Sequence, residues 1–317
     1  MDSDQVTNSN STAEVVVVGA ACLDVKGRPL GDIVAGTSKP GVVQISVGGG
    51  ARNVAENLAR LGTPTTLLSV VCQDDFGRTI IRQTEQAGVD TDHMLISCEQ
   101  HSAAYMALQS AERALLVALD DTTATSALTP EYIIDHASLL EQARMVVIDA
   151  NVPLKTAETL LSICRVAGVP VALEPVAYAP ALRYRSLAGA FYLMTPNGVE
   201  AQALTGLPVA DTAQGGLAAK QLVAAGVQIA IITLGHDGLV YATPEASGYV
   251  PSIEGEIIDP TGAGDALTAA VVYALLNDIP VDEAVRLGVS AASLTLASND
   301  TVRQDLSLES LYAQLVI

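Results

Sequence analysis

Short apolar runs alternate along the chain with amphipathic segments, and this alternation is the first structural signal in the sequence. Six runs are rich in β-branched residues and have the length of strands that are buried on both faces. They cover Glu14–Ala20, Thr65–Cys72, Met145–Asp149, Pro170–Pro175, Tyr192–Pro196 and Gln228–Gly235. Strands of this kind belong to a mainly parallel sheet that is covered by helices.

The segments between these runs have helical periodicity, and each of the clearest four ends near a glycine. The predicted helices cover Arg52–Leu61, Gly77–Ala87, Ala157–Ala167 and Ala213–Ala225, and the glycines are Gly62, Gly88, Gly168 and Gly226. A glycine directly after a helix suits the left-handed backbone of a helix C-terminus. The pattern therefore predicts a three-layer α/β/α fold with a central, mainly parallel sheet.

Two regions break this rhythm and do not fit a βαβ unit. Asp24–Val47 is rich in glycine, proline and short β-prone pieces, and Ser97–Leu119 contains two alternating strands, Ala104–Ser110 and Arg113–Leu119. We expect both regions, about residues 24–47 and 97–120, to form a small β-sheet beside the carboxyl end of the first strand. Ligands of open α/β sheets bind at that end, so this sheet is expected to act as a lid. An ordinary surface hairpin is the alternative.

The length and composition fit one large α/β domain with a small appendage, or two domains, rather than a disordered or membrane-spanning chain. Half of the 317 residues are hydrophobic and 16% are charged, which allows a sizeable core. We expect one domain over residues 14–317 after a polar tail, residues 1–13. The tail lacks a basic region followed by an apolar one, so it is not a secretory signal, and the apolar runs are shorter than a membrane span.

The charge and the cysteines narrow the possible partners. The formal net charge is −19, and such a surface repels nucleic acid and anionic membranes. The four cysteines are far apart in sequence, which is typical of reduced thiols in a cytoplasmic protein. A small-molecule substrate is the remaining class of ligand.

The most informative string is the glycine-rich segment at residues 259–266, which precedes a helical run, Ala266–Leu276. A glycine-rich turn that opens a helix presents unpaired backbone N–H groups at the positive end of the helix dipole, and so binds anions. Gly262 and Gly264 would let the backbone approach the anion closely. Asp265, in the first helical turn, is then placed to accept a proton from a hydroxyl that is being phosphorylated. The alternative is a carboxylate that only stabilises the helix dipole.

Other nucleotide-binding motifs are absent from the sequence. It contains no Gly-Lys dipeptide, which excludes a P-loop. The glycine-rich segment lacks the third glycine of a dinucleotide fingerprint, which argues against a dehydrogenase.

The string at 259–266 resembles the C-terminal signature of the ribokinase-like (PfkB) family of carbohydrate kinases. The string at 48–53, which leads into a predicted helix, resembles the N-terminal signature of the same family. The resemblance extends from Glu14 to the end of the chain, with several motifs in the same order. It implies an ATP-dependent kinase with Asp265 as the catalytic base. The backbone of Gly262, Ala263 and Gly264 would stabilise the transferred phosphoryl group.

On the acceptor side, the resemblance implies that Asp24 holds two ribose hydroxyls and that Gly48 and Gly49 let the backbone meet the sugar. Asn53 is expected to hydrogen-bond a sugar hydroxyl. The alternatives are a turn residue for Asp24 and a helix cap for Asn53.

Several strings resemble one subgroup of the family, which phosphorylates the 5′-hydroxyl of the nucleoside pseudouridine. They cover Asp24–Pro29, Gly36–Gly41, Ala51–Gly62 and Thr295–Ser298. Gly50 stands where ribokinases commonly carry a lysine, and Arg52 where they often carry a small residue, so both weaken a ribose assignment. The alternatives are another sugar kinase of the family, such as a ribokinase or a fructokinase-like enzyme, an adenosine kinase, or a binding protein that kept the fold without turnover.

On the nucleotide side, Asn197 and Glu200 match the N-x-x-E motif of the family. The i, i+3 spacing places both side chains on one face of a helix start, where they suit a hydrated Mg²⁺. A helix-capping arrangement is the alternative.

The resemblance also assigns phosphate and cation contacts. Thr233, Gly235 and Gly238 would contact the ATP phosphates. Asp259 and Thr261 match positions that bind a monovalent cation, usually K⁺. The adenine pocket is expected within residues 285–299. Exposed edges of a β lid need covering, so we expect a homodimer formed through the lids.

Overall fold

The computed structural model describes residues 14–33, 36–97, 101–111 and 115–315. An eight-stranded sheet in the order β14-β13-β12-β11-β10-β9-β1-β4 forms the centre. Six of its strands are parallel: β1 Val15–Val18, β4 Thr65–Leu68, β9 Met145–Asp149, β10 Val171–Glu174, β11 Leu193–Met194 and β12 Ile229–Thr233. The last two, β13 Leu239–Ala242 and β14 Ser247–Val250, are antiparallel.

Each of the six predicted strands contains a strand of this sheet, but the predicted strand over Thr65–Cys72 is two strands. β4 ends at Leu68, and β5, Val70–Cys72, pairs instead with β6, Leu95–Ser97. The break falls at Ser69, whose hydroxyl donates to the carbonyl of Gly19 at 2.6 Å. The prediction of one strand was wrong because both segments are equally buried, and burial does not reveal a change of partner.

Helices cover both faces of the sheet, as the alternating side chains of its strands require. The helices are α1 Gly50–Arg60, α2 Asp75–Gln86, α3 Pro130–Asp135, α4 Ala137–Gln142, α5 Leu154–Ala167, α6 Tyr178–Tyr184, α7 Gly198–Thr205, α8 Thr212–Ala224, α9 Ala263–Leu276, α10 Val281–Leu296 and α11 Leu308–Gln314. Val16 and Val18 of β1 belong to one core with α3 to α8, and Val15 and Val17 to another with α1, α2, α9 and α10. The predicted three-layer fold is confirmed.

The glycines expected at helix C-termini have left-handed backbone. The φ angle is 86° at Gly62, 90° at Gly88, 74° at Gly168 and 124° at Gly226. These glycines let the chain leave each helix and turn back toward the sheet.

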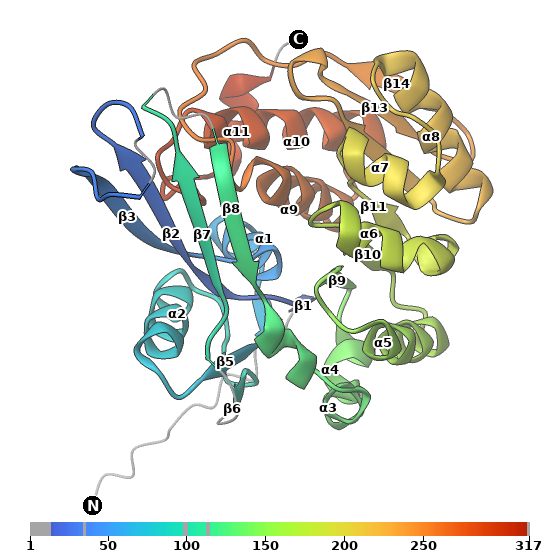
Figure 1. Ribbon diagram of the computed structural model, residues 1–317. Coiled ribbons are helices and arrows are strands. Elements are labelled where there is room, and N and C mark those ends of the chain that lie inside the picture. Colours follow the sequence, from blue (N-terminus) through green and yellow to red (C-terminus); the bar gives the residue numbers. More distant parts are fainter. Residues whose placement is uncertain (1–13, 34–35, 98–100, 112–114, 316–317) are drawn as a thin grey trace, which may run out of the picture.

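A separate four-stranded sheet lies beside the main one, at the left of Figure 1. We call it the lid sheet; its order is β3-β2-β7-β8. Its strands are β2 Cys22–Pro29, β3 Gly41–Gly48, β7 Ala104–Gln109 and β8 Leu115–Asp121. The predicted small sheet is confirmed. Its role as a lid stays a prediction, as do the limits of the domain. The predicted tail at 1–13 and the first two residues of the predicted strand Arg113–Leu119 lie outside the described residues.

The register of the lid sheet separates a polar face from an apolar one. Asp24 pairs with Tyr105, and Tyr105 pairs with Asp120, so these three side chains lie in one row on one face. The next row, on the opposite face, contains Met106 and Leu119. These two side chains are 55% and 67% exposed, so the outer face of the lid sheet presents apolar residues to its surroundings.

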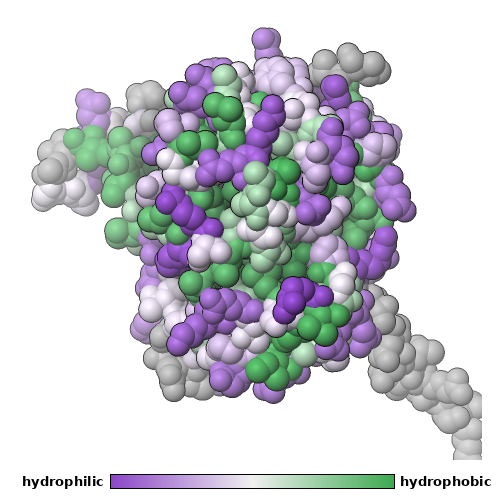
Figure 2. Space-filling model, turned by 90° about the vertical axis from the view of Figure 1, so that its right-hand side faces the viewer, coloured by the Kyte–Doolittle hydropathy of each residue, from purple (hydrophilic) through white to green (hydrophobic). Residues whose placement is uncertain are grey.

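Figure 2 shows a different face, the side of the molecule over α5 to α8, where hydrophilic side chains lie between small groups of apolar ones. The exposed apolar residues there stand on separate helices, for example Val166 on α5 and Leu217 on α8. Among the described residues, no helix is both long and apolar enough to cross a membrane.

Candidate active site

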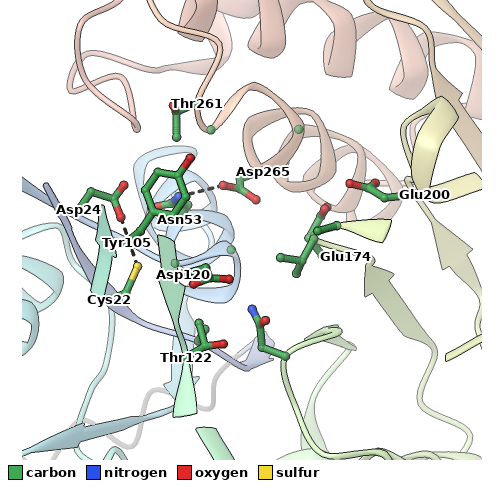
Figure 3. A pocket seen from close by; sticks show the side chains of 18 of the residues that line it. Cys22, Asp24, Asn53, Tyr105, Asp120, Thr122, Glu174, Glu200, Thr261 and Asp265 are labelled. Carbon is green, nitrogen blue, oxygen red and sulfur yellow. Dashed lines mark hydrogen bonds between the residues drawn. The ribbon is translucent and has the colours of Figure 1, made fainter. Parts of the chain in front are cut away.

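A cavity of about 530 Å³ lies where the carboxyl ends of the parallel strands meet the polar face of the lid sheet. Most of the predicted site residues line it. From the acceptor side and the glycine turn these are Asp24, Gly49, Asn53, Thr261, Gly262, Gly264 and Asp265, and from the nucleotide side Asn197, Glu200 and Thr233. In Figure 3, Asp265 lies between the lid residues Asp24 and Tyr105 on one side and Glu174 and Glu200 on the other.

The glycine-rich turn is held in place by contacts that only glycine permits. Gly262 has a φ of 84°, and a Cβ there would lie 2.0 Å from the carbonyl oxygen of Thr301. Helix α9 begins directly after it, at Ala263. The N–H groups of the first turn have no partner within the helix and lie at the positive end of its dipole. A turn of this kind can hold an anion.

Asp265 lies in this first turn, and its carboxylate faces the acceptor side of the cavity. Asn53 of α1 donates its Nδ2 hydrogen to Oδ2 of Asp265 at 2.8 Å. The pKa of Asp265 is raised to about 7: burial raises it most, the hydrogen bond from Asn53 lowers it, and the charges of Asp149, Asp24 and Glu200 raise it further. A carboxyl group that titrates near neutral pH is suited to general base catalysis.

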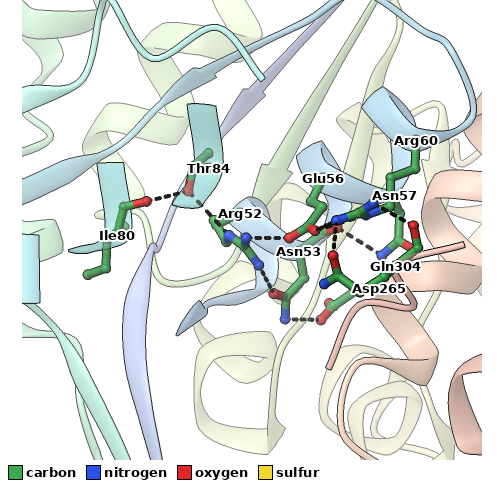
Figure 4. A network of polar contacts seen from close by, with 9 residues as sticks. All are labelled: Arg52, Asn53, Glu56, Asn57, Arg60, Ile80, Thr84, Asp265 and Gln304. Atoms are coloured by element: carbon green, nitrogen blue, oxygen red, sulfur yellow. Dashed lines mark hydrogen bonds and ion pairs between the residues drawn. The ribbon is translucent and has the colours of Figure 1, made fainter. Parts of the chain in front are cut away.

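Arg52 fixes the orientation of Asn53, as Figure 4 shows. Its Nη1 donates to Oδ1 of Asn53 at 3.4 Å, which leaves the amide nitrogen to face Asp265. Arg52 is 3% exposed; it forms an ion pair with Glu56, and its Nε donates to the hydroxyl of Thr84 at 3.3 Å. We had noted Arg52 only as a departure from ribokinases. The i, i+4 spacing of Arg52 and Glu56 was the available signal.

Asp149, at the end of β9, is a buried carboxylate that sequence reasoning missed. It accepts hydrogen bonds from the backbone N–H groups of Ala20 at 2.8 Å, Ala51 at 3.1 Å and Asn151 at 2.9 Å. Burial raises its pKa, and these hydrogen bonds lower it. A Cβ at Gly19 would lie 2.4 Å from this carboxyl group. Asp149 thus ties the end of β1 to the start of α1, and an acidic residue that ends an apolar strand was the signal.

The lid sheet contributes the acceptor wall of the cavity. The thiol of Cys22 donates to Oδ1 of Asp24 at 3.2 Å, and burial raises the pKa of Asp24. Gly48 pairs with Cys22 on the neighbouring strand, and a Cβ at Gly48 would be 2.4 Å from the Asp24 carboxylate, so this glycine makes room for Asp24. Tyr105 and Asp120 complete the row, and neither was predicted to be a site residue.

The N-x-x-E motif forms the helix cap that was its alternative explanation. Oδ1 of Asn197 accepts from the backbone N–H of Glu200 at 3.0 Å, and Oε2 of Glu200 accepts from the backbone N–H of Asn197 at 2.9 Å. Both side chains still line the cavity, and burial raises the pKa of Glu200. In the part of the chain that the structure describes, no three His, Cys, Asp or Glu side chains are grouped to hold a metal directly. A cation here would be held largely through water.

Glu174, at the end of β10, adds a second carboxylate to the nucleotide side, beside Glu200 and near Asp265. It accepts hydrogen bonds from Thr268 at 2.7 Å and from Thr195 at 3.2 Å. Burial raises its pKa well above the usual range, as do the charges of Asp265 and Glu200. A cation at this wall would relieve the repulsion among the three carboxylates.

Asp259, predicted to bind a monovalent cation, lies beneath the turn rather than on the cavity. Nζ of Lys26 in β2 lies 2.6 Å from its Oδ2, and the N–H of Thr261 donates to its Oδ1 at 2.9 Å. Burial raises the pKa of Asp259, but the hydrogen bonds from Lys26 and Thr261 outweigh it and lower the pKa. An ammonium group of the chain thus pairs with this carboxylate.

A second, more apolar cavity of about 180 Å³ adjoins the first and shares Thr233 and Gly264 with it. Three further predicted residues line it: Gly235, Gly238 and Ala263. The rest of its lining includes Leu239, Ile253, Leu267, Val289, Ala292, Ser293 and Leu296. The sequence had indicated residues 285–299 for an adenine pocket without singling any out.

A glycine turn at the start of a helix, beside a half-buried carboxylate at the carboxyl ends of a parallel sheet, is an arrangement suited to phosphoryl transfer. The chain matches the model of the pfkB family carbohydrate kinases over residues 12–306, and it belongs to that family. It is therefore a kinase, a phosphotransferase with an alcohol group as acceptor.

Three similar proteins illustrate the range of the family. The chain is 30% identical to pseudouridine kinase of Escherichia coli K12, over 93% of this chain and 94% of that protein. It is 31% identical to ribokinase of Haemophilus influenzae, over 80% and 82%. The structure of Arabidopsis thaliana ribokinase complexed with ribose and ATP has the same fold, with a TM-score of 0.84 at 22% identity, over 96% of this chain and 99% of that one.

Proposed function

We propose that this kinase transfers the γ-phosphate of ATP to the 5′-hydroxyl of a nucleoside, and that the nucleoside is pseudouridine. The observation that carries the proposal is the position of Asp265, which lies beside the anion-binding turn and receives a hydrogen bond from Asn53 of the acceptor wall. The hydroxyl and the phosphate would meet at this carboxylate.

The nucleotide side has a pocket for the base and an opening through which the phosphates would reach the start of α9. The apolar cavity at α10 suits an adenine ring, and it opens at Thr233 and Gly264 into the larger cavity. Phosphates that follow this path reach the N–H groups at the start of α9. Asn197 and Glu200 would hold a hydrated Mg²⁺, whose charge would offset that of the phosphates and of the nearby carboxylates.

The acceptor side would orient the sugar and remove its proton. Asp24 has two carboxylate oxygens, which suit the two neighbouring hydroxyls of a ribose ring. Asp265 accepts the proton of the primary hydroxyl, while the backbone N–H groups after Gly262 stabilise charge on the transferred phosphoryl group. Closure of the lid sheet over the cavity would exclude water from this step.

A nucleoside fits this site better than a free pentose does. The cavity continues past Asp24 and Asp265 to Tyr105, Asp120 and Thr122 on the lid side, and to Asn151 after β9. These groups lie beyond the sugar-binding residues and could contact a base. Gly50 lacks the lysine side chain of ribokinases, and the likeness to a pseudouridine kinase covers nearly the whole chain.

Two further features belong to the proposal. We infer a homodimer in which the apolar outer faces of two lid sheets cover each other. A monovalent cation near Asp259 and Thr261 would stiffen the turn, although Lys26 already neutralises Asp259.

The test is ADP release by the purified protein with ATP, Mg²⁺ and a panel of acceptors. Phosphorylation of pseudouridine, in preference to uridine, adenosine, ribose and fructose, is expected. A preference for ribose would instead make the protein a ribokinase, and binding of pseudouridine without ADP release would make it a non-catalytic binding protein.

A further inference from the structure

One row of polar side chains on the lid sheet extends the acceptor wall beyond the residues that are proposed to bind the sugar. The cross-strand pairs Asp24–Tyr105 and Tyr105–Asp120 place the three side chains on one face, at successive strands. All three line the cavity, and Figure 3 shows them on the same side of Asp265. If Asp24 binds the ribose hydroxyls, Asp120 lies two strands further along, outside the sugar-binding part of the wall.

Among the described residues, no hydrogen bond or ion pair reaches the carboxylate of Asp120. The side chain is exposed and lines the cavity, so it is open to water and to a ligand. Its neighbour Asp121 points to the other face of β8 and accepts a hydrogen bond from the backbone N–H of Thr123 at 3.2 Å. Burial raises the pKa of Asp120, as does the charge of Asp121. An ionised carboxylate that faces a cavity without a donor is ready to accept a hydrogen bond from a ligand.

The two uracil nucleosides differ in the donors that they offer. In uridine the glycosidic bond occupies N1, so the base has one N–H, at N3, between two carbonyl oxygens. These oxygens repel a carboxylate. In pseudouridine the glycosidic bond is at C5, and N1–H is free. It has a carbonyl on one side only and the C6–H group on the other. A carboxylate therefore suits the N1–H edge of pseudouridine and has no equivalent partner in uridine.

We propose that Asp120 determines nucleoside specificity by accepting a hydrogen bond from N1–H of the pseudouracil ring. This inference rests on the proposed function and deepens it. Thr122 and Asn151, which also line the cavity, offer a hydroxyl and an amide for the carbonyl groups of the base. A site that is built to hydrogen-bond a donor discriminates strongly against an analogue that lacks it.

The test compares Asp120→Asn with the wild type on three nucleosides: pseudouridine, 1-methylpseudouridine and uridine. The substitution keeps the size of the side chain and removes its charge. The amide oxygen of asparagine can still accept the hydrogen bond but carries no charge. We therefore expect kcat/KM for pseudouridine to fall by about 5- to 10-fold, the difference between a hydrogen bond to a charged group and one to a neutral group. The values for 1-methylpseudouridine and uridine, which lack N1–H, should change by less than about threefold, within ordinary context effects.

The matched control is Asp121→Asn, which removes the same charge from the opposite face of the same strand. It should leave all three values of kcat/KM close to those of the wild type. Equal losses of Asp120→Asn on all three nucleosides would overturn the inference, because they would assign Asp120 to lid structure or to sugar binding. Unchanged turnover of pseudouridine would overturn it as well. A wild type that does not phosphorylate pseudouridine would instead refute the proposed function, which is a separate result.

Discussion

The two walls of the cavity are built in different ways. The phosphate wall is made of backbone: a glycine turn at 262–264 and the first turn of α9. The acceptor wall is made of side chains that come from the lid sheet and from α1, and the α1 residue Asn53 is held by a buried network around Arg52. A backbone site depends on a few glycines, whereas a side-chain site depends on the register of four strands and on several ion pairs. Substitutions should therefore affect the two walls differently.

The largest loss of turnover is expected from a substitution of Asp265, which lies where the two walls meet. Asp265→Asn removes the proton acceptor but keeps the size of the side chain, so kcat should fall by roughly 10² to 10⁴. Binding of ATP, measured by calorimetry, should stay near that of the wild type because the turn is intact. Turnover within a few-fold of the wild type would remove Asp265 from this role.

The second-largest loss of turnover is expected from a substitution in the phosphate wall. Gly262→Ala places a Cβ 2.0 Å from the carbonyl oxygen of Thr301 and forces a left-handed backbone on alanine. Displacing the turn should cost roughly 10²- to 10³-fold in kcat, as the loss of an oxyanion donor does. The control is Gly216→Ala in α8, where a Cβ has no neighbour within 4 Å. If Gly262→Ala retained full turnover, the backbone would not be holding the phosphoryl group.

Substitutions in the acceptor wall should shift the dependence of kcat/KM on pH. Asp265 acts as a base only when deprotonated, and its pKa is raised to about 7, so kcat/KM should fall as the pH drops below 7. The hydrogen bond from Asn53 lowers this pKa. Asn53→Leu should therefore move the acidic limb of the profile to higher pH, and Arg52→Lys should move it in the same direction by less. Profiles that coincide with that of the wild type would show that the network does not act on Asp265.

A smaller effect on activity is expected at Lys26. Its ammonium group neutralises Asp259 beneath the turn, so K⁺ should stimulate the wild type only weakly. Lys26→Met leaves Asp259 unpaired, and K⁺ should then raise kcat over the value measured with a bulky tetraalkylammonium salt. Strong and equal K⁺ activation of both proteins would show that the cation site and the ion pair are independent.

The smallest effect on turnover is expected at the outer face of the lid sheet. Met106→Lys together with Leu119→Lys charges this exposed apolar face and should convert a dimer to a monomer in light-scattering measurements. Val166→Lys on α5 is the control for an exposed apolar residue elsewhere. A wild type that elutes as a monomer at micromolar concentration would contradict the dimer.

The difference between the walls also explains what the sequence could predict. The parallel strands, the helix-ending glycines and the turn at 262–264 follow from local patterns, so periodicity and glycine spacing were enough. Tyr105 and Asp120 join Asp24 only through cross-strand register, which no local pattern fixes. The role of Arg52 needed its burial to be known, because an exposed arginine would have the same spacing to Glu56.

The most direct test is a crystal structure with pseudouridine and a non-hydrolysable ATP analogue. We expect the 5′-hydroxyl within hydrogen-bonding distance of the Asp265 carboxylate, and the terminal phosphate against the N–H groups that follow Gly262. A nucleoside whose 5′-hydroxyl points away from Asp265, or a terminal phosphate out of reach of that turn, would contradict the account.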